Sequence, residues 1–108
     1  MPTPENRVKD RLNKALKPFG AKLYKFMPVQ TGYGRKTLDY LICFNGHFIA
    51  IETKAPGKKM TPLQEETACQ LIEAGATVYL VDGPEGIDRV VGDLIRTCPS
   101  SFLRPTKP

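Results

Sequence analysis

From Thr37 to Lys54 the chain reads TLDYLICFNGHFIAIETK, and this stretch decides the fold. Asn45-Gly46 separates two apolar runs, and both residues tolerate the positive φ of a type I′ turn. The pattern therefore predicts a β-hairpin. In its register Phe44 faces His47, and Asp39 lies directly opposite Glu52.

The two faces of this hairpin are expected to differ, because side chains alternate along a strand. The face expected to enter the core carries Leu38, Tyr40, Ile42 and Phe44 opposite His47, Ile49, Ile51 and Thr53. On the other face, Lys54 points the same way as Glu52. Facing carboxylates repel each other, and burial of such a pair ordinarily needs a compensating cation. The alternative interpretation is a solvated edge with scattered charges.

A divalent metal ion would compensate these acids. Mg²⁺ prefers hard oxygen ligands, commonly one or two carboxylates completed by water and substrate phosphate. Asp39 and Glu52 are therefore candidate metal ligands, helped by the Thr53 carbonyl. Lys54 is the candidate to position or activate the attacking water, or to stabilise charge on a phosphate.

These residues also resemble a known family. Asp39, followed by Glu52-Thr53-Lys54 at the end of the next strand, is similar to the PD-(D/E)XK nuclease motif. The continuation 55–59 (APGKK) and 61–64 (TPLQ) resembles its VRR-NUC branch, over roughly Glu5 to Val81. Leu38 stands where the motif name has proline, the family's least demanding position. The resemblance implies a restriction-endonuclease-like fold and a DNA nuclease that uses Mg²⁺ or Mn²⁺.

Length and composition indicate one small domain. The 108 residues suffice for a single core, expected over 1–98, with a Pro-rich tail at 99–108. No apolar run approaches a membrane span and no signal peptide is apparent. The odd, widely spaced cysteines at 43, 69 and 98 indicate a reducing compartment. We therefore expect a cytoplasmic protein, and the resemblance implies a bacterial or phage-infected cell.

The net charge of +5 is unevenly distributed. Residues 1–36 hold nine Lys or Arg against two acids, whereas residues 37–108 hold seven against nine. A basic half beside an acid cluster suits a polyanion held near a metal site. A solvated basic surface is the alternative.

The N-terminal part is expected to form a helix and a strand. Thr3-Pro4-Glu5 is typical of a helix start, and Pro18 with Gly20 ends the helix. Its apolar stripe holds Val8, Leu12, Ala15, Leu16 and Phe19. A strand over 21–27 follows, with Leu23, Tyr24 and Phe26 as packing candidates. Glu5 either complements the helix dipole or, as the resemblance implies, supports the metal site.

The Gly-rich loop 28–36 and the basic loop 55–60 are the candidate DNA contacts. The DNA-binding candidates are Tyr33, Arg35, Lys36, Lys58 and Lys59. For Tyr33 a simple connecting loop is the alternative. His47 is the single histidine, which nearly excludes histidine-based metal nucleases and Ser-His-Asp hydrolases, and we interpret it as structural.

Thr61-Pro62-Leu63-Gln64 forms a capping-box pattern at the start of a second helix. Gln64 either completes this cap or, as the resemblance implies, lies at the edge of the active site; one amide is not expected to serve both fully. The helix is expected to bury Leu63, Thr67, Leu71 and Ile72, and to end at Gly75. A strand over 77–81, parallel to that of Glu52, and an amphipathic helix over 86–96 follow.

The sequence thus predicts an α/β fold in the order α-β-β-β-α-β-α, with a mixed sheet and the acids at one end. The predicted function is a metal-dependent endonuclease with Asp39, Glu52, Lys54, Gln64 and Glu5 in its site. Small stand-alone VRR-NUC proteins, often phage-encoded, act as homodimers on four-way (Holliday) junctions, and the resemblance implies the same here. The alternatives are a flap, nick or duplex nuclease and a non-catalytic DNA-binding subunit.

Overall fold

The predicted hairpin is the centre of the fold. The computed structural model describes residues 3–28 and 37–96. Strands β2 (Tyr40–Phe44) and β3 (His47–Thr53) pair antiparallel, with Phe44 opposite His47 and Tyr40 opposite Ile51. Asn45 and Gly46 have φ values of 53° and 78°, as a type I′ turn requires. The register predicted from the turn is therefore confirmed.

Four strands form one mixed sheet in the order β1-β2-β3-β4. Strand β1 (Leu23–Phe26) runs antiparallel to β2, and β4 (Thr77–Val81) runs parallel to β3. Helix α2 (Pro62–Glu73) makes the crossover between β3 and β4. The chain is therefore an α/β protein with an open mixed sheet flanked by helices.

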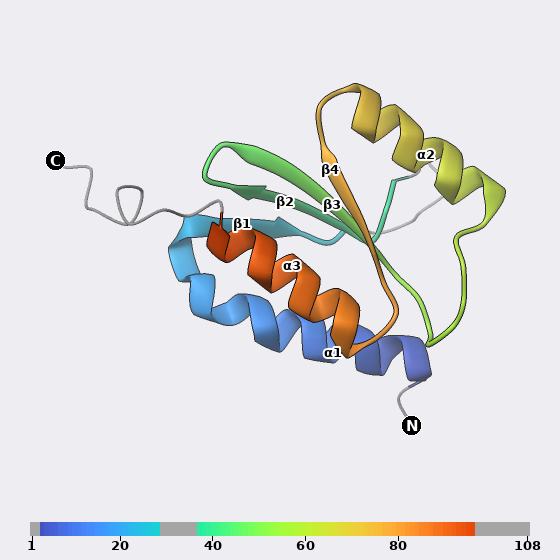
Figure 1. Cartoon of the computed structure of the whole chain (residues 1–108), viewed down its shortest axis with the longest axis horizontal. Helices are drawn as coiled ribbons and strands as arrows, with labels where there is room; N and C mark the ends of the chain where they lie inside the picture. The colour runs from blue at the N-terminus through green and yellow to red at the C-terminus, as the bar shows by residue number, and fades with distance from the viewer. Residues whose placement is uncertain (1–2, 29–36, 97–108) are drawn as a thin grey trace, which may run out of the picture.

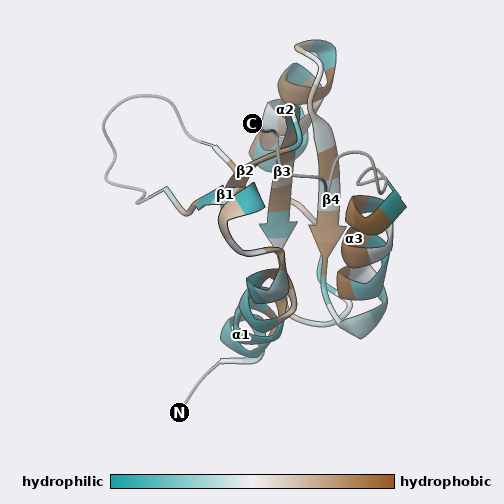
Figure 2. Ribbon diagram, turned by 90° about the vertical axis from the view of Figure 1, so that its left-hand side faces the viewer, coloured by the Kyte–Doolittle hydropathy of each residue, from teal (hydrophilic) through white to brown (hydrophobic). Residues whose placement is uncertain are grey.

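Helices α1 (Pro4–Leu16) and α3 (Pro84–Arg96) lie side by side on one face of the sheet (Figure 1). Figure 2 shows apolar stretches of β3 and β4 beside α3, and a hydrophilic end of β3. The buried core between these two helices and the sheet comprises Val8, Leu12, Leu16, Tyr40, Ile42, Phe44, Ile49, Ile51, Val81, Ile87, Val90 and Leu94.

Helix α2 covers part of the opposite face, where Ala68 packs with Leu38 and Ala50. This placement corrects the prediction that Leu38 lies on the core face of the hairpin. The chain bends at Asp39, before β2 begins, so the strict alternation of the strand does not extend to Leu38. The predicted buried face of α2 is also wrong in part, because Leu63 and Ile72 are each more than half exposed.

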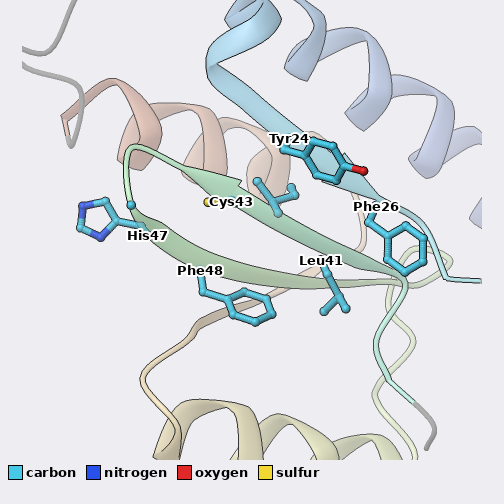
Figure 3. A pocket seen from close by; sticks show the side chains of 8 residues that line it. Tyr24, Phe26, Leu41, Cys43, His47 and Phe48 are labelled. Carbon is cyan, nitrogen blue, oxygen red and sulfur yellow. The ribbon is translucent and has the colours of Figure 1, made fainter. Parts of the chain in front are cut away.

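Strand β1 is shorter than predicted, and two of its packing candidates are solvent-exposed. The six residues Lys17–Lys22 form a 3₁₀ segment, η1, in which Gly20 takes a φ of 60°. Leu23 packs against the core. Tyr24 and Phe26 lie on the opposite face of the sheet and are exposed, because α2 covers that face elsewhere and does not extend over β1 (Figure 3). His47, which the sequence placed on the core face and for which we expected a structural role, is exposed, because it lies at the start of β3 beside the hairpin turn.

The last helix starts earlier than predicted, at Pro84 instead of Gly86, and Ile95 on its outer side is exposed. Within residues 3–28 and 37–96, no helix has the length and apolar character needed to cross a membrane. Several predicted features lie outside the described residues: Tyr33, Arg35, Lys36, Cys98 and the tail 99–108.

The close approach of α3 to β4 requires glycine at position 86. A Cβ at Gly86 would lie 3.1 Å from the Cα of Val81 and 3.4 Å from the carbonyl oxygen of Leu80. Both contacts are backbone atoms of a sheet strand, which yield less easily than side chains. We expect Gly86→Ala to lower the free energy of unfolding by about 1–3 kcal/mol, measured by urea denaturation.

Gly92→Ala in the same helix is the matched control. There a Cβ would meet only the end of the Arg96 side chain, at 3.6 Å or more. Alanine also favours the helix over glycine by about 1 kcal/mol. Gly92→Ala should therefore be neutral or stabilising, and equal destabilisation by both substitutions would contradict the packing argument.

Candidate active site

Asp39 and Thr53 lie at one end of the hairpin, just beyond the last β2–β3 pair, Tyr40 with Ile51. The Oδ2 atom of Asp39 accepts a hydrogen bond from the Thr53 hydroxyl at 2.7 Å and another from the Thr53 backbone N–H at 3.0 Å. Thr53 itself is fully buried. Asp39 is therefore fixed against β3 through Oδ2, while Oδ1 faces helix α1.

Glu52 is a buried carboxylate, only 3% exposed. The backbone N–H of Asp39 donates a hydrogen bond to it, and Lys54 Nζ lies 3.7 Å from its Oε2 atom. The backbone N–H of Lys54 donates to the Val81 carbonyl at 2.9 Å, which continues the pairing of β3 with β4. The sheet therefore orients both ends of the Glu52–Lys54 pair, as the sequence predicted.

Gln64 serves both roles that the sequence left as alternatives. Its Oε1 accepts from the backbone N–H of Thr61 at 3.0 Å and completes the capping box of α2. Its Nε2 donates to Oε2 of Glu52 at 2.9 Å. The expectation that one amide does not serve both is wrong, because the oxygen faces the helix terminus while the nitrogen faces the site.

The electrostatics of the cluster disfavour the charged form of Glu52. Burial of the carboxyl is the largest cause, followed by the negative charge of Asp39, and together they raise the pKa of Glu52 from 4.5 to about 7. The ammonium of Lys54 opposes the shift in part. Burial beside Asp39 thus disfavours the carboxylate form of Glu52.

Helix α1 brings a lysine to the site that the sequence analysis missed. Lys9 Nζ lies 4.0 Å from Asp39 Oδ1 and 3.5 Å from Glu5 Oε2. The Tyr40 hydroxyl donates to Asn13 Oδ1 at 3.1 Å and ties the helix to the start of β2. Glu5 therefore borders the site through Lys9, and the i, i+4 spacing of Glu5 and Lys9 was the available sequence signal.

A pocket of about 200 Å³ opens onto the two acids. Its lining residues are Thr37, Asp39, Glu52, Thr61, Leu63, Gln64 and Thr67. Within the described ranges, no three or more His, Cys, Asp and Glu side chains are grouped to hold a metal ion. Two carboxylates with water and phosphate oxygens nevertheless suit Mg²⁺, and a cation between them would offset the repulsion of the two acids.

The basic loop after β3 is anchored beside the site. The backbone N–H of Gly57 donates to Oδ2 of Asp82 at 3.2 Å, and Lys58 N–H donates to the Ala55 carbonyl at 3.0 Å. Lys58 and Lys59 are exposed on this loop. Their ammonium groups are thus presented to solvent, as a phosphate contact requires.

The structure thus gathers Asp39, Glu52, Lys54, Gln64 and, through Lys9, Glu5. Comparison with known proteins adds no relative: no protein-family description scanned matches the chain, and a search of curated proteins finds no match.

The raised pKa of Glu52 predicts a pH-dependent stability. The pKa of Glu52 in the folded protein, about 7, lies above the ordinary value of 4.5, so the folded state binds the proton more tightly than the unfolded state. The contribution of this proton to the stability of the wild type is therefore fully present below pH 4.5 and is lost as the pH rises through 7. Without metal, the melting temperature of Glu52→Gln relative to that of the wild type should therefore rise between pH 5 and pH 8. The shift in the pKa of Glu52 corresponds to a change of up to about 3 kcal/mol in the free energy of unfolding.

Melting curves in EDTA across this pH range would check the difference between the two proteins. Asp88→Asn, which removes an exposed acid of α3, is the matched control and should run parallel to the wild type. A constant difference between Glu52→Gln and the wild type at all pH values would contradict the electrostatic account.

The two roles of Gln64 can be separated by Gln64→Glu. Glutamate keeps an oxygen for the Thr61 N–H, so the cap of α2 remains, but Glu52 loses its donor and gains a negative neighbour. We expect about 1–3 kcal/mol of destabilisation at pH 8, shrinking at pH 5 as the acids protonate. Denaturant unfolding at both pH values measures it.

Thr61→Ala is the comparison, because it removes the cap alone. It should cost about 1 kcal/mol at either pH. If Gln64→Glu and Thr61→Ala showed the same pH dependence, the hydrogen bond from Gln64 to Glu52 would contribute nothing measurable.

Proposed function

We propose that this chain is a Mg²⁺- or Mn²⁺-dependent DNA endonuclease that hydrolyses phosphodiester bonds. The observation that carries the proposal is the pair Asp39 and Glu52, held together at the end of β3 with Lys54 3.7 Å from Glu52. A buried acid beside another acid costs stability, and a bound cation would remove that cost.

The donor set fits a hard divalent cation. Asp39 and Glu52 would hold the ion, with the Thr53 carbonyl as a further oxygen ligand. Such an ion supplies Lewis-acid stabilisation of the phosphate and lowers the pKa of a bound water.

The chain's own residues supply the remaining parts. Lys54 would position or activate the attacking water and stabilise charge on the phosphate. Water adds to phosphorus, the bond from phosphorus to one sugar oxygen breaks, and that oxygen leaves with a proton. Lys9, beside Asp39 Oδ1, would contact the DNA phosphate, and Gln64 and Thr53 hold the two acids in place.

DNA contacts in this proposal come from the basic loops. Lys58 and Lys59 are exposed beside the site, and Tyr33, Arg35 and Lys36 belong to the loop before β2 that lies outside the described residues. Lys and Arg side chains bind phosphates without reading base sequence. A preference for DNA shape over sequence follows from such contacts.

The finer assignment rests on the resemblance to the VRR-NUC branch of the PD-(D/E)XK nucleases. It comprises a restriction-endonuclease-like fold, action on four-way junctions as a homodimer, and a place in the cytoplasm of a bacterial or phage-infected cell. The α/β arrangement with Glu52 and Lys54 at the end of a sheet strand is compatible with it. Fold alone does not fix a substrate.

The proposal predicts cleavage of end-labelled DNA with Mg²⁺ or Mn²⁺, abolished by EDTA. A four-way junction, a flap and a linear duplex of matched sequence are compared. Asp39→Asn and Glu52→Gln should each lower the cleavage rate by about 100-fold or more, because each removes a charge that binds the metal. Asp88→Asn, an exposed acid on α3, should leave the rate unchanged.

Each outcome assigns the chain to one class. Symmetric cuts in the junction alone, absent in both site variants, support a junction resolvase. Equal cutting of all three substrates keeps the metal nuclease and removes the junction preference. Tight DNA binding without cleavage under any metal condition would overturn the proposed nuclease activity and favour a non-catalytic DNA-binding subunit.

A further inference from the structure

Helix α1 places Lys9 between two carboxylates that belong to different parts of the fold. Its Nζ atom lies 3.5 Å from Oε2 of Glu5, one helical turn earlier, and 4.0 Å from Oδ1 of Asp39, just before β2. Both distances exceed the roughly 2.7–3.2 Å of an N–H···O hydrogen bond. The ammonium therefore compensates both acids by its charge and is not tightly hydrogen-bonded to either.

The backbone of Lys9 is held against the sheet. The hydroxyl of the buried Tyr40 lies 3.4 Å from the Lys9 carbonyl oxygen and donates to Asn13 Oδ1 at 3.1 Å. The same Asn13 oxygen accepts from Lys25 Nζ of β1 at 2.8 Å. Because the lysine ammonium stands on a flexible four-carbon chain, it can move between Glu5 and Asp39 while the helix stays in place.

The Asp39 oxygen beside Lys9 is the one that remains for a metal ion. Oδ2 accepts two hydrogen bonds from Thr53, which use the two lone pairs of that oxygen. Oδ1 faces α1 and the Lys9 ammonium. A cation at the acid pair would therefore bind Asp39 through the atom that Lys9 neutralises.

Lys54 differs from Lys9 in this respect. Its Nζ lies 3.7 Å from Oε2 of Glu52, the oxygen that already accepts from Gln64. Within residues 3–28 and 37–96, Lys54 forms an ion pair with this one acid, whereas Lys9 has two acidic partners. Lys9 is thus the lysine of the site that can leave one acid for another.

We propose that Lys9 is an internal counter-ion of the acid pair, which neutralises Asp39 in the metal-free protein and turns to Glu5 when a divalent cation binds. The proposal rests on the proposed function, because it requires a cation site at Asp39 and Glu52. Two cations beside one carboxylate oxygen repel each other, and Glu5 receives the one that leaves. Since an ammonium has three N–H donors, Lys9 paired with Glu5 keeps donors for a DNA phosphate.

This role gives two residues one turn apart opposite effects on the affinity for the cation. Lys9 lowers the affinity because it competes for Asp39, and Glu5 raises it because it draws Lys9 away. A simple surface ion pair at this spacing would stabilise the helix alike with and without metal. The sign of the two effects therefore distinguishes a counter-ion from a structural pair.

Mn²⁺ affinity measured without DNA tests Lys9. Isothermal titration calorimetry at pH 8 should show Lys9→Met binding Mn²⁺ about tenfold more tightly than the wild type, because the competing charge is gone. Methionine keeps an unbranched side chain and a high helix propensity. Lys14→Met, the matched control, removes the same charge from the exposed last turn of α1 and should change the affinity less than about twofold.

Glu5→Gln should weaken Mn²⁺ binding by about fivefold, because Lys9 then stays at Asp39. If Glu5 acts through Lys9, the same substitution made together with Lys9→Met should change the affinity by less than about twofold. An equal loss in both backgrounds would show that Glu5 itself binds the ion, and would overturn the counter-ion role.

Melting temperatures give a second readout. Without metal, Lys9→Met should melt below the wild type, because Asp39 has lost its counter-ion, and saturating Mn²⁺ should raise its melting temperature by more than that of the wild type. Lys14→Met should follow the wild type in both conditions. If Lys9→Met lost the same number of degrees with and without Mn²⁺, Lys9 would be a structural ion pair alone.

The outcomes separate the role of Lys9 from the nuclease itself. Changes in Mn²⁺ affinity in the expected directions without DNA cleavage support the counter-ion and overturn the nuclease. DNA cleavage together with an unchanged Mn²⁺ affinity in Lys9→Met overturns the counter-ion and leaves the nuclease standing. Absence of Mn²⁺ binding in all of these proteins would overturn the cation site that both require.

Discussion

The opposition of Asp39 and Glu52 is the constraint on which the rest of this structure depends. Burying a carboxylate beside another one is costly unless each is hydrogen-bonded and charge is compensated. The partners that meet this demand come from every layer of the fold. Thr53 and Lys54 belong to the sheet, Gln64 to α2 and Lys9 to α1. The positions of the two helices at this edge are thus tied to the two acids.

The features that the sequence predicted well are those set by local chemistry. Asn45-Gly46 determines both the turn and the register, because the two positive φ values leave one way to pair the strands. The capping box at Thr61 and the end of α2 before Gly75 likewise involve residues within a few positions of each other. The placement of Glu52 and Lys54 on one face likewise follows from the register and from the alternation of side chains along β3.

The features that the sequence did not predict depend on which elements meet in space. Leu38 lies on the α2 side of the sheet, not on the predicted core face, because the bend at Asp39 interrupts the alternation of side chains. Tyr24 is exposed because α2 does not extend over β1. Lys9 resembled any surface lysine until α1 was fixed against β2. The double role of Gln64 required both the helix terminus and the buried acid to be known. Periodicity carries none of this information.

Two features of the chain cost free energy when it is isolated, and they have the same physical form. Burial of the Glu52 carboxyl, with the negative charge of Asp39 beside it, raises the pKa of Glu52 to about 7. The rings of Tyr24, Phe26 and Phe48 lack apolar cover, and water must solvate surface that a core would bury. A sequence selected for stability alone would replace an acid by an amide and a surface phenylalanine by a polar residue. A cation bound at the acids, as in the proposed function, would offset the first cost, and apolar contact at the rings would offset the second.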